Sequence, residues 1–283
     1  GEIAGDGIDN DGNGYVDDIN GIDTANADSD PMDDTGHGTH VAGTTAAAGN
    51  NSIGVSGVSW NSKIMALKVL GLNGGSTAGI IEAVNYMVTM KTRFGINIVV
   101  SNNSYGGGGF NQAFMDAIQA SIDVGIPFVA AAGNSALDND VFATYPATYP
   151  LDGIIAVAAS DNRDRNAHFT HFGKTTVDLS APGVDILSTT LGGGYGLSSG
   201  TSMASPHVAG VVALLAGYAP NATVSQIKSA ILLGADPIAA MDGTTVTGAR
   251  LNAAKSLFLI GSGDPRITNR DVDLYQFKLG VGE

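Results

Sequence analysis

Four short apolar runs, separated by helical patterns, most constrain the fold of this chain. The runs are rich in Val, Ile and Ala and span residues 64–70, 96–101, 127–132 and 154–159. Between them, residues 77–94 and 110–124 carry patterns typical of helices. Apolar strands that alternate with helices are typical of a parallel sheet covered on both faces. The sequence therefore predicts an α/β domain whose reactive loops gather at the carboxyl ends of its strands.

Composition excludes several classes of protein. A chain of 283 residues that is 43% hydrophobic and 14% charged can bury a large core, unlike a disordered chain. Its formal net charge of −14 argues against a nucleic-acid partner, because phosphate binding needs clustered Lys and Arg. The sequence contains no cysteine, which excludes thiol chemistry and disulfides within it. No stretch reaches the roughly 18 apolar residues of a membrane span.

Residues 200–210 read Gly-Thr-Ser-Met-Ala-Ser-Pro-His-Val-Ala-Gly and predict a tight turn that leads into a buried helix. Ser202 is expected at the helix start, with Pro206 in the first turn. The hydroxyl would be exposed at a bend, and the unpaired N–H groups of the helix terminus would face an oxyanion formed by its attack on a carbonyl. On this segment alone, a serine that caps a core helix is an equally good interpretation.

Two further segments supply the partners that a nucleophilic serine needs. Residues 36–43, Gly-His-Gly-Thr-His-Val-Ala-Gly, put His37 at the start of another helix of small residues. Residues 131–134, Ala-Ala-Gly-Asn, put Asn134 at the end of an apolar strand. In their residues and in their order along the chain, these two segments and the serine segment closely resemble the motifs of the subtilisin-like serine peptidase family. The resemblance runs from about residue 20 to about residue 255. The resemblance implies a three-layer α/β/α fold with a mainly parallel central sheet.

The resemblance also implies a function, that of a serine endopeptidase with broad specificity that is secreted and acts on polypeptides. Ser202 would attack the peptide carbonyl and His37 would take and return the proton. The side-chain amide of Asn134 and the backbone N–H of Ser202 would stabilise the oxyanion. We expect a monomer.

The substrate groove follows from the same resemblance. One wall would be formed by Ser104, Tyr105 and Gly106, and the other by Ala132 and Gly133. Substrate would join the sheet edge through backbone hydrogen bonds, which accommodates many sequences. Tyr105 at the wall would favour large apolar or aromatic side chains.

An Asp/Asn/Gly-rich segment predicts a structural calcium site. Residues 9–17 match the first nine positions of an EF-hand loop, with Gly14 at the sharp turn. Position twelve is Asn20 in place of a bidentate Glu, so we predict a single loop without flanking helices. Its ligands would be the side chains of Asp9, Asp11, Asn13 and Asp17 and the carbonyl of Tyr15. A turn that binds nothing is the alternative.

A second acidic segment follows. Asp23, Asp28 and Asp30 could hold another calcium, as in some relatives of the family, and a plain acidic surface loop is the alternative.

The remaining histidines favour structural interpretations. His168 and His171 predict a surface β segment near the cleft, because a metal pair would lack a third ligand nearby. His40 and His207 lie in helix starts rich in Ala, Gly and Val, and we expect them to be packed and hydrogen-bonded.

The C-terminal part is expected to close the domain. Residues 223–233 and 249–257 predict two surface helices, and the peptidase domain would span residues 1–260. Residues 261–283 would form a linker and then the first strand of a β-sandwich, because their alternating end resembles the pre-peptidase C-terminal domains of secreted bacterial enzymes.

One part of the catalytic apparatus has no candidate in the sequence. In the resembling family an Asp follows the first core strand and orients the His, within an apolar run that ends in Asp-Ser/Thr-Gly. No such run precedes His37. The sequence therefore predicts a fragment that lacks its first strand and catalytic Asp, is inactive alone and folds poorly. An inactive peptide-binding module of this fold, or an esterase or peptide ligase, are the alternatives.

Overall fold

A computed structural model describes residues 2–263, and the predicted β-sandwich strand lies outside the described residues. The helices are α1 His37–Ala46, α2 Thr77–Thr92, α3 Gln112–Asp123, α4 Thr201–Tyr218, α5 Val224–Gly234 and α6 Ala253–Gly261. The strands are β1 Gly21–Asp23, β2 Ala66–Lys68, β3 Ser101–Asn103, β4 Phe128–Ala131, β5 Ile154–Ser160, β6 Leu179–Pro182, β7 Ile186–Thr190, β8 Gly194–Ser198, β9 Asp236–Pro237 and β10 Ala249–Arg250. Two 3₁₀ turns span Leu191–Gly193 and Ala239–Met241.

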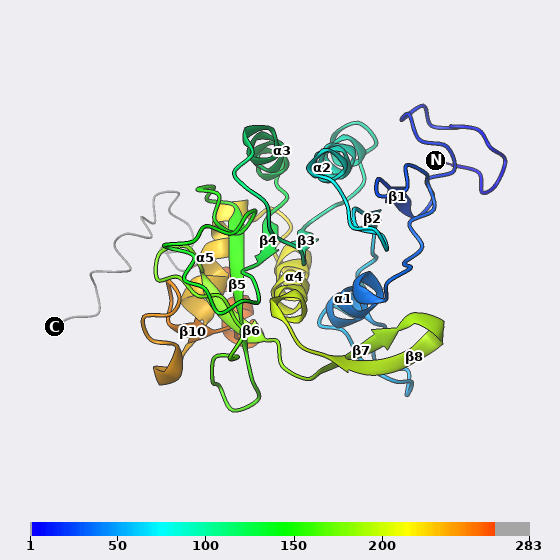
Figure 1. Cartoon of the computed structure of the whole chain (residues 1–283). Coiled ribbons are helices and arrows are strands. Elements are labelled where there is room, and N and C mark those ends of the chain that lie inside the picture. The colour runs from blue at the N-terminus through cyan, green and yellow to red at the C-terminus, as the bar shows by residue number, and fades with distance from the viewer. Residues whose placement is uncertain (1, 264–283) are drawn as a thin grey trace.

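The main sheet is largely parallel, as the apolar runs predict. Its six strands follow the order β3-β4-β5-β6-β10-β9, and only the β9–β10 pair is antiparallel. β1 and β2 form a separate parallel pair, and β7 and β8 form an antiparallel hairpin. Figure 1 shows α2 and α3 above the sheet, and α4 and α5 pack together against its other face. The three-layer α/β/α prediction is confirmed.

The core is divided by the sheet into two apolar clusters. Val129 and Ile155 pack with α4 and α5 on one face. Their chain neighbours Phe128 and Ile154 pack with α2 and α3 on the other face. Adjacent residues of a strand point to opposite faces, so a strand buried on both sides must be apolar throughout. This is why β4, and β5 as far as Ala159, are uninterrupted apolar runs.

Two elements near the C-terminus differ from their predictions. The predicted helix over 249–257 begins later, because Ala249 and Arg250 pair as β10 with neighbouring strands. Asn252 then caps α6 by accepting the backbone N–H of Lys255. The prediction of a surface helix over 223–233 is also incomplete, since one side of α5, including Ile227 and Ile231, is buried in the core.

Among residues 2–263, no helix is both long and apolar enough to span a bilayer.

Candidate active site

Ser202 is the second residue of α4, close to where the sequence predicts it. The helix has no side-chain cap, since Gly200 precedes it. The backbone N–H of Ser202 has no acceptor among the described residues, while the N–H groups of Met203 and Ala204 bond to the carbonyl of Gly200. The hydroxyl of Ser202 donates a hydrogen bond to the carbonyl of Ser104 at 3.2 Å. A free N–H and a half-buried hydroxyl therefore lie together at a helix N-terminus, where negative charge is stabilised.

The prediction that Pro206 lies in the first turn is wrong, because α4 begins at Thr201 and Pro206 is its sixth residue. Proline has no N–H, so the carbonyl of Ser202 lacks its helical partner. The hydroxyl of Ser104 replaces that partner, at 2.9 Å from the Ser202 carbonyl oxygen. Ser104 also lies 2.8 Å from the hydroxyl of Ser205. The position of Ser104 is thus coupled to the first two turns of α4.

Asn134 is held beside the start of α4 by its side-chain oxygen. That oxygen accepts the backbone N–H of Thr201 at 2.8 Å and the Thr201 hydroxyl at 3.0 Å. The side-chain NH₂ of Asn134 has no hydrogen-bond acceptor among the described residues. A methyl group on Gly200 would lie 3.6 Å from both this nitrogen and the backbone nitrogen of Ser202. Two unpaired donors therefore flank the same small space beside Gly200.

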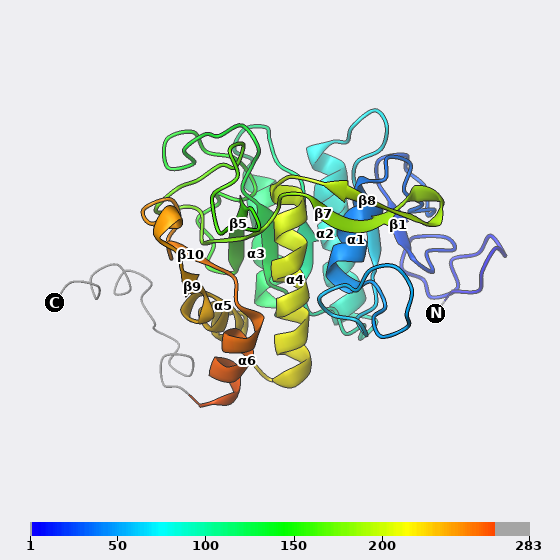
Figure 2. The same cartoon turned by 90° about the horizontal axis from the view of Figure 1, so that it is seen from below.

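His37 is the first residue of α1, and three contacts fix how α1 lies against α4. Near the helix starts, the His40 ring contacts the carbonyl of Ile186, and Gly200 bonds to nearby Gly183. Further along both helices, a methyl group on Gly210, midway along α4, would lie 3.2 Å from the carbonyl of Thr45 near the end of α1. The two helices therefore run in the same direction, and Figure 2 shows the β7–β8 hairpin across their ends. His37 and Ser202 consequently lie at the same end of the domain.

The environment of His37 favours a neutral imidazole. His37 is exposed, and the desolvation that its neighbours still impose lowers the pKa of its ring from the ordinary value, against an opposing effect of the Asp33 charge. Asp33 itself is occupied, because its carboxylate accepts the backbone N–H groups of Thr35, Gly36 and Thr39. Within residues 2–263, no carboxylate hydrogen-bonds to the His37 ring. A neutral imidazole can accept a proton, and in the described chain no acid orients it.

The predicted groove residues follow two neighbouring strands. Ser104, Tyr105 and Gly106 come after β3, and Ala132 and Gly133 come after β4, with which β3 pairs in parallel. The two segments therefore leave the sheet at the same edge. Tyr105 packs against the core cluster of α3, and its hydroxyl donates to the Asn103 side chain at 2.9 Å. Desolvation raises the pKa of the Tyr105 hydroxyl.

The smaller histidine predictions are confirmed for His40 and His207, confirmed only in its exposure for His168, which lies in a turn, and wrong for His171. His40 is buried, and its Nε2 lies 2.9 Å from the carbonyl oxygen of Ile186. His207 is half-buried, with Nδ1 2.8 Å from the Met203 carbonyl oxygen. His168 is exposed as predicted, but His171 is buried, since its ring packs against Gly133. Sequence reasoning also missed Thr201, although the Gly-Thr-Ser motif contains it.

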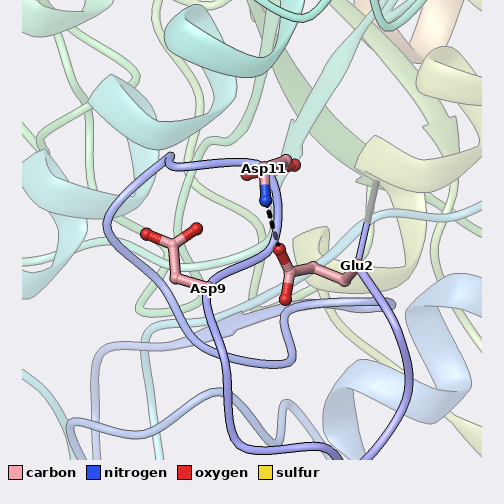
Figure 3. A group of neighbouring side chains, drawn as sticks. All are labelled: Glu2, Asp9 and Asp11. Atoms are coloured by element: carbon pink, nitrogen blue, oxygen red, sulfur yellow. Dashed lines mark hydrogen bonds between the residues drawn. The ribbon is translucent and has the colours of Figure 1, made fainter.

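The predicted calcium loop brings only some of its residues together. Carboxylate oxygens of Asp9 and Asp11 lie within 4.8 Å of one another and of a third from Glu2, as Figure 3 shows. Loop spacing gave no signal for Glu2, which precedes the loop. Asp17 lies outside this group, and its carboxylate accepts the N–H groups of Gly5 and Gly7.

Asn13, another predicted loop ligand, also makes protein contacts. The side-chain oxygen of Asn13 accepts the N–H of Tyr15, and its NH₂ donates to the carboxylate of Asp18. Hard oxygen ligands of this kind suit calcium. The negative charges also oppose one another, since burial and then the neighbouring charges of Asp18, Glu2 and Asp9 raise the pKa of Asp11.

The second acidic segment is partly neutralised by protein groups. Asp23 is buried, and its carboxylate lies 3.0 Å from the ammonium group of Lys68. The same ammonium group lies 3.0 Å from Asp34. Asp23 also accepts the backbone N–H groups of Ala25 and Asn26. Its carboxylate is therefore satisfied without a metal ion.

Comparisons with known proteins agree with this geometry. Residues 3–272 match the profile of the Subtilase family. The chain is 41% identical over 237 residues to the thermophilic serine proteinase of Bacillus sp. (strain AK1). The aligned region covers 83% of this chain and 55% of that protein. The chain is also 41% identical over 209 residues to an extracellular protease of Xanthomonas campestris pv. campestris, covering 69% of this chain and 35% of that protein. The chain thus spans about half or less of the length of these curated relatives.

A solved structure described as a cold adapted subtilisin-like serine proteinase superposes with a TM-score of 0.72 and 36% identity. The superposition covers 82% of this chain and 80% of that one.

Proposed function

The chain belongs to the subtilase family, and we propose that it is the peptidase domain of a serine endopeptidase with Ser202 as nucleophile. The observation that carries this proposal is the pair of unpaired donors, Asn134 NH₂ and Ser202 N–H, beside the Ser202 hydroxyl. A developing oxyanion in that space would receive two hydrogen bonds. One such donor is worth roughly 2.7–4 kcal/mol in the transition state.

The catalytic steps assigned to these residues are those of acyl transfer. His37 takes the proton of the Ser202 hydroxyl as oxygen attacks the peptide carbonyl carbon, and the carbonyl oxygen becomes the oxyanion. His37 then protonates the leaving amine, and an ester forms at Ser202. Water hydrolyses that ester with His37 again as the base. The hydrogen bond from Ser202 to the Ser104 carbonyl must break before His37 can accept the proton.

We propose that the acid of the triad comes from a strand outside residues 2–263 that lies between β2 and β3. Among the described residues, β2 pairs only with β1, and β3 pairs only with β4. Leu67 of β2 and Ile98 just before β3 both pack against the cluster of α2 and α3 and against a smaller cluster of Ile22, Tyr86 and Met90, so these strands border one region of the core. A strand there would pair with both open edges, and an Asp at its carboxyl end would lie at the active-site end of the sheet.

We also propose a structural calcium ion at Glu2, Asp9 and Asp11, with Asn13, Tyr15 and Asp17 as further ligands in a rearranged loop. The support is the set of three neighbouring carboxylates. An ion would neutralise them and link residue 2 to the loop. An ion that binds the folded chain and not the unfolded chain would raise the free energy of unfolding by mass action.

The substrates proposed are polypeptides bound between residues 104–106 and 132–133, with broad specificity. Secretion is proposed because a relative is described as an extracellular protease. We further propose a monomer with no nucleic-acid partner, in keeping with the net charge of −14.

A serine-directed fluorophosphonate probe tests the proposed function. The protein expressed from its complete gene should form an adduct that mass spectrometry locates at Ser202, and it should cleave peptides. Ser202→Ala should abolish the adduct, while Ser225→Ala, at an exposed position of α5, should leave it unchanged. Absence of labelling would favour the inactive peptide-binding module, and cleavage of esters without cleavage of peptides would favour an esterase or ligase.

A further inference from the structure

His171 and Asn139 form a buried pair behind the strand end that carries Asn134. The two residues are 5% and 2% exposed. Nδ1 of His171 lies 2.9 Å from the side-chain oxygen of Asn139. The NH₂ of Asn139 donates in turn to the carbonyl of Ala132 at 3.0 Å. The chemistry proposed above uses neither side chain.

These contacts define the tautomer of the His171 ring. The NH₂ of Asn139 faces a carbonyl, so its oxygen faces the ring and Nδ1 must carry the proton. Nε2 is then unprotonated, and this buried atom has no hydrogen-bond partner among the described residues. The hydroxyl oxygen of Thr144 lies 3.3 Å from Nδ1. Burial lowers the pKa of His171, which agrees with a neutral ring that donates from Nδ1.

His171 also contacts the main chain at Gly133 directly. Its backbone N–H donates to the Gly133 carbonyl at 2.9 Å. Gly133 has a φ of 123°, and a methyl group there would lie 2.4 Å from Nδ1 of His171. The ring therefore fills the space that a side chain of residue 133 would need. The strand end cannot move toward the ring without a clash.

On its other side, the same strand end is held by α4. The backbone N–H of Gly133 donates to the Thr201 hydroxyl at 3.1 Å, and Thr201 donates to Asn134. Residues 132–134 are thus clamped between the start of α4 and the His171–Asn139 pair.

We propose that His171, acting with Asn139, is a positioning residue that holds the Asn134 amide at the distance from Ser202 that oxyanion stabilisation requires. The proposal rests on the proposed function of Ser202 and Asn134. Misplacement of a catalytic group by about an ångström can cost on the order of 100-fold in rate.

Steady-state kinetics of the protein expressed from its complete gene test this role. His171→Leu removes the donor, whereas His171→Asn keeps an amide donor near the position of Nδ1. We expect His171→Leu to lower kcat at least about tenfold with KM within about threefold, because an oxyanion donor acts mainly in the transition state. His171→Asn should recover most of the loss. His168→Leu, at an exposed histidine nearby, should change nothing.

A double-mutant cycle separates positioning from a general structural role. In an Asn134→Ala background, His171→Leu should lower kcat by less than about twofold, since the group that it positions is gone. A full additional loss in that background, or an unchanged kcat in the single variant, would overturn the proposal. If His171→Leu loses its cooperative melt, Asn139→Ser replaces it with the same expectations.

An NMR measurement keeps this proposal distinct from the proposed function. The side-chain amide signal of Asn134, assigned by its loss in Asn134→Ala, should move in His171→Leu and stay in place in His168→Leu. If the unmodified protein cleaves no peptide, the proposed function fails while this signal still tests the positioning. An Asn134 signal unchanged in His171→Leu would refute the positioning whether or not the protein is active.

Discussion

The hydroxyl of Ser104 lies 2.9 Å from the carbonyl oxygen of Ser202, the carbonyl that Pro206 leaves without a helical partner. Ser202 returns a hydrogen bond from its own hydroxyl to the Ser104 carbonyl at 3.2 Å. The segment after β3, predicted to bind substrate, is thereby joined in both directions to the proposed nucleophile. The proposed substrate-binding segment and the proposed nucleophile are therefore linked through one pair of residues.

Ser104→Ala should therefore destabilise the fold. The substitution leaves the Ser202 carbonyl without a protein partner and removes the contact with Ser205. An unsatisfied buried acceptor costs about 1–3 kcal/mol, so we expect a loss of that size in the free energy of unfolding. Denaturant titration measures it, with Ser225→Ala as a control that should stay within about 0.5 kcal/mol. Equal effects of the two substitutions would contradict the structural role.

Gly133→Ala should be more damaging than Gly107→Ala, although the two glycines have nearly the same positive φ. The φ angles are 123° and 124°, but a methyl group meets the His171 ring only at residue 133 and has nothing within 4 Å at residue 107. The difference in unfolding free energy isolates the contact with His171, and overpacking of this kind costs about 1–3 kcal/mol. Thermal or denaturant unfolding of both variants provides the comparison. Equal losses would mean that strain alone matters.

Sequence patterns predicted the layers because local apolar character determines which strands are buried on both faces. The patterns were less accurate where pairing between strands that are distant in the sequence determines the secondary structure. The apolar run 96–101 predicts a strand, but the described strand is Ser101–Asn103, because its ladder with β4 begins only at Ser101. Likewise Ala249 and Arg250 have a helical pattern but pair with β6 and β9.

Site prediction had the same limit. The motifs predict Ser202, His37 and Asn134 as catalytic residues, because each motif consists of a few adjacent residues. The burial of His171 depends on Asn139, 32 residues away, so an alternating His pattern could not reveal it. Glu2 joins Asp9 and Asp11 only through the folding of the loop.

The acid limb of Ser202 labelling should depend on His37. Desolvation lowers the pKa of the His37 ring, so in residues 1–283 the imidazole stays neutral to a pH below the value of about 6.5 for free histidine. The labelling rate should therefore fall only as the pH drops through this lowered pKa. A carboxylate bonded to His37 in the product of the complete gene would raise that pKa and move the limb to higher pH. Labelling rates of both proteins across pH test this. If the labelling rates of the two proteins fall over the same pH range, no carboxylate is bonded to His37 in the product of the complete gene, which would argue against the proposed acid.

Calcium removal should destabilise the chain. A chelator should lower the melting temperature of the unmodified protein, and added calcium should restore it. Asp11→Asn should weaken calcium binding at least about tenfold by removing one of three clustered carboxylates. Asp152→Asn, at an exposed position outside the loop, is the matched control. A melting temperature indifferent to the chelator would mean that the loop is an Asp/Asn/Gly turn that holds no ion.

Backbone exchange at two strand edges tests the proposed strand between β2 and β3. Ladder bonds alternate along a parallel strand, and Ala66 and Ser101 direct their N–H groups to β1 and β4 respectively. The intervening amides of Leu67 and Asn102 must therefore point to the open edges. Both should exchange rapidly in residues 1–283 and become protected in the product of the complete gene, because an inserted strand would accept them. The amide of Val129, in the middle of buried β4, should be protected in both proteins. Rapid exchange at Leu67 and Asn102 in both would mean that no strand fills this position, and the acid of the triad would have to come from elsewhere.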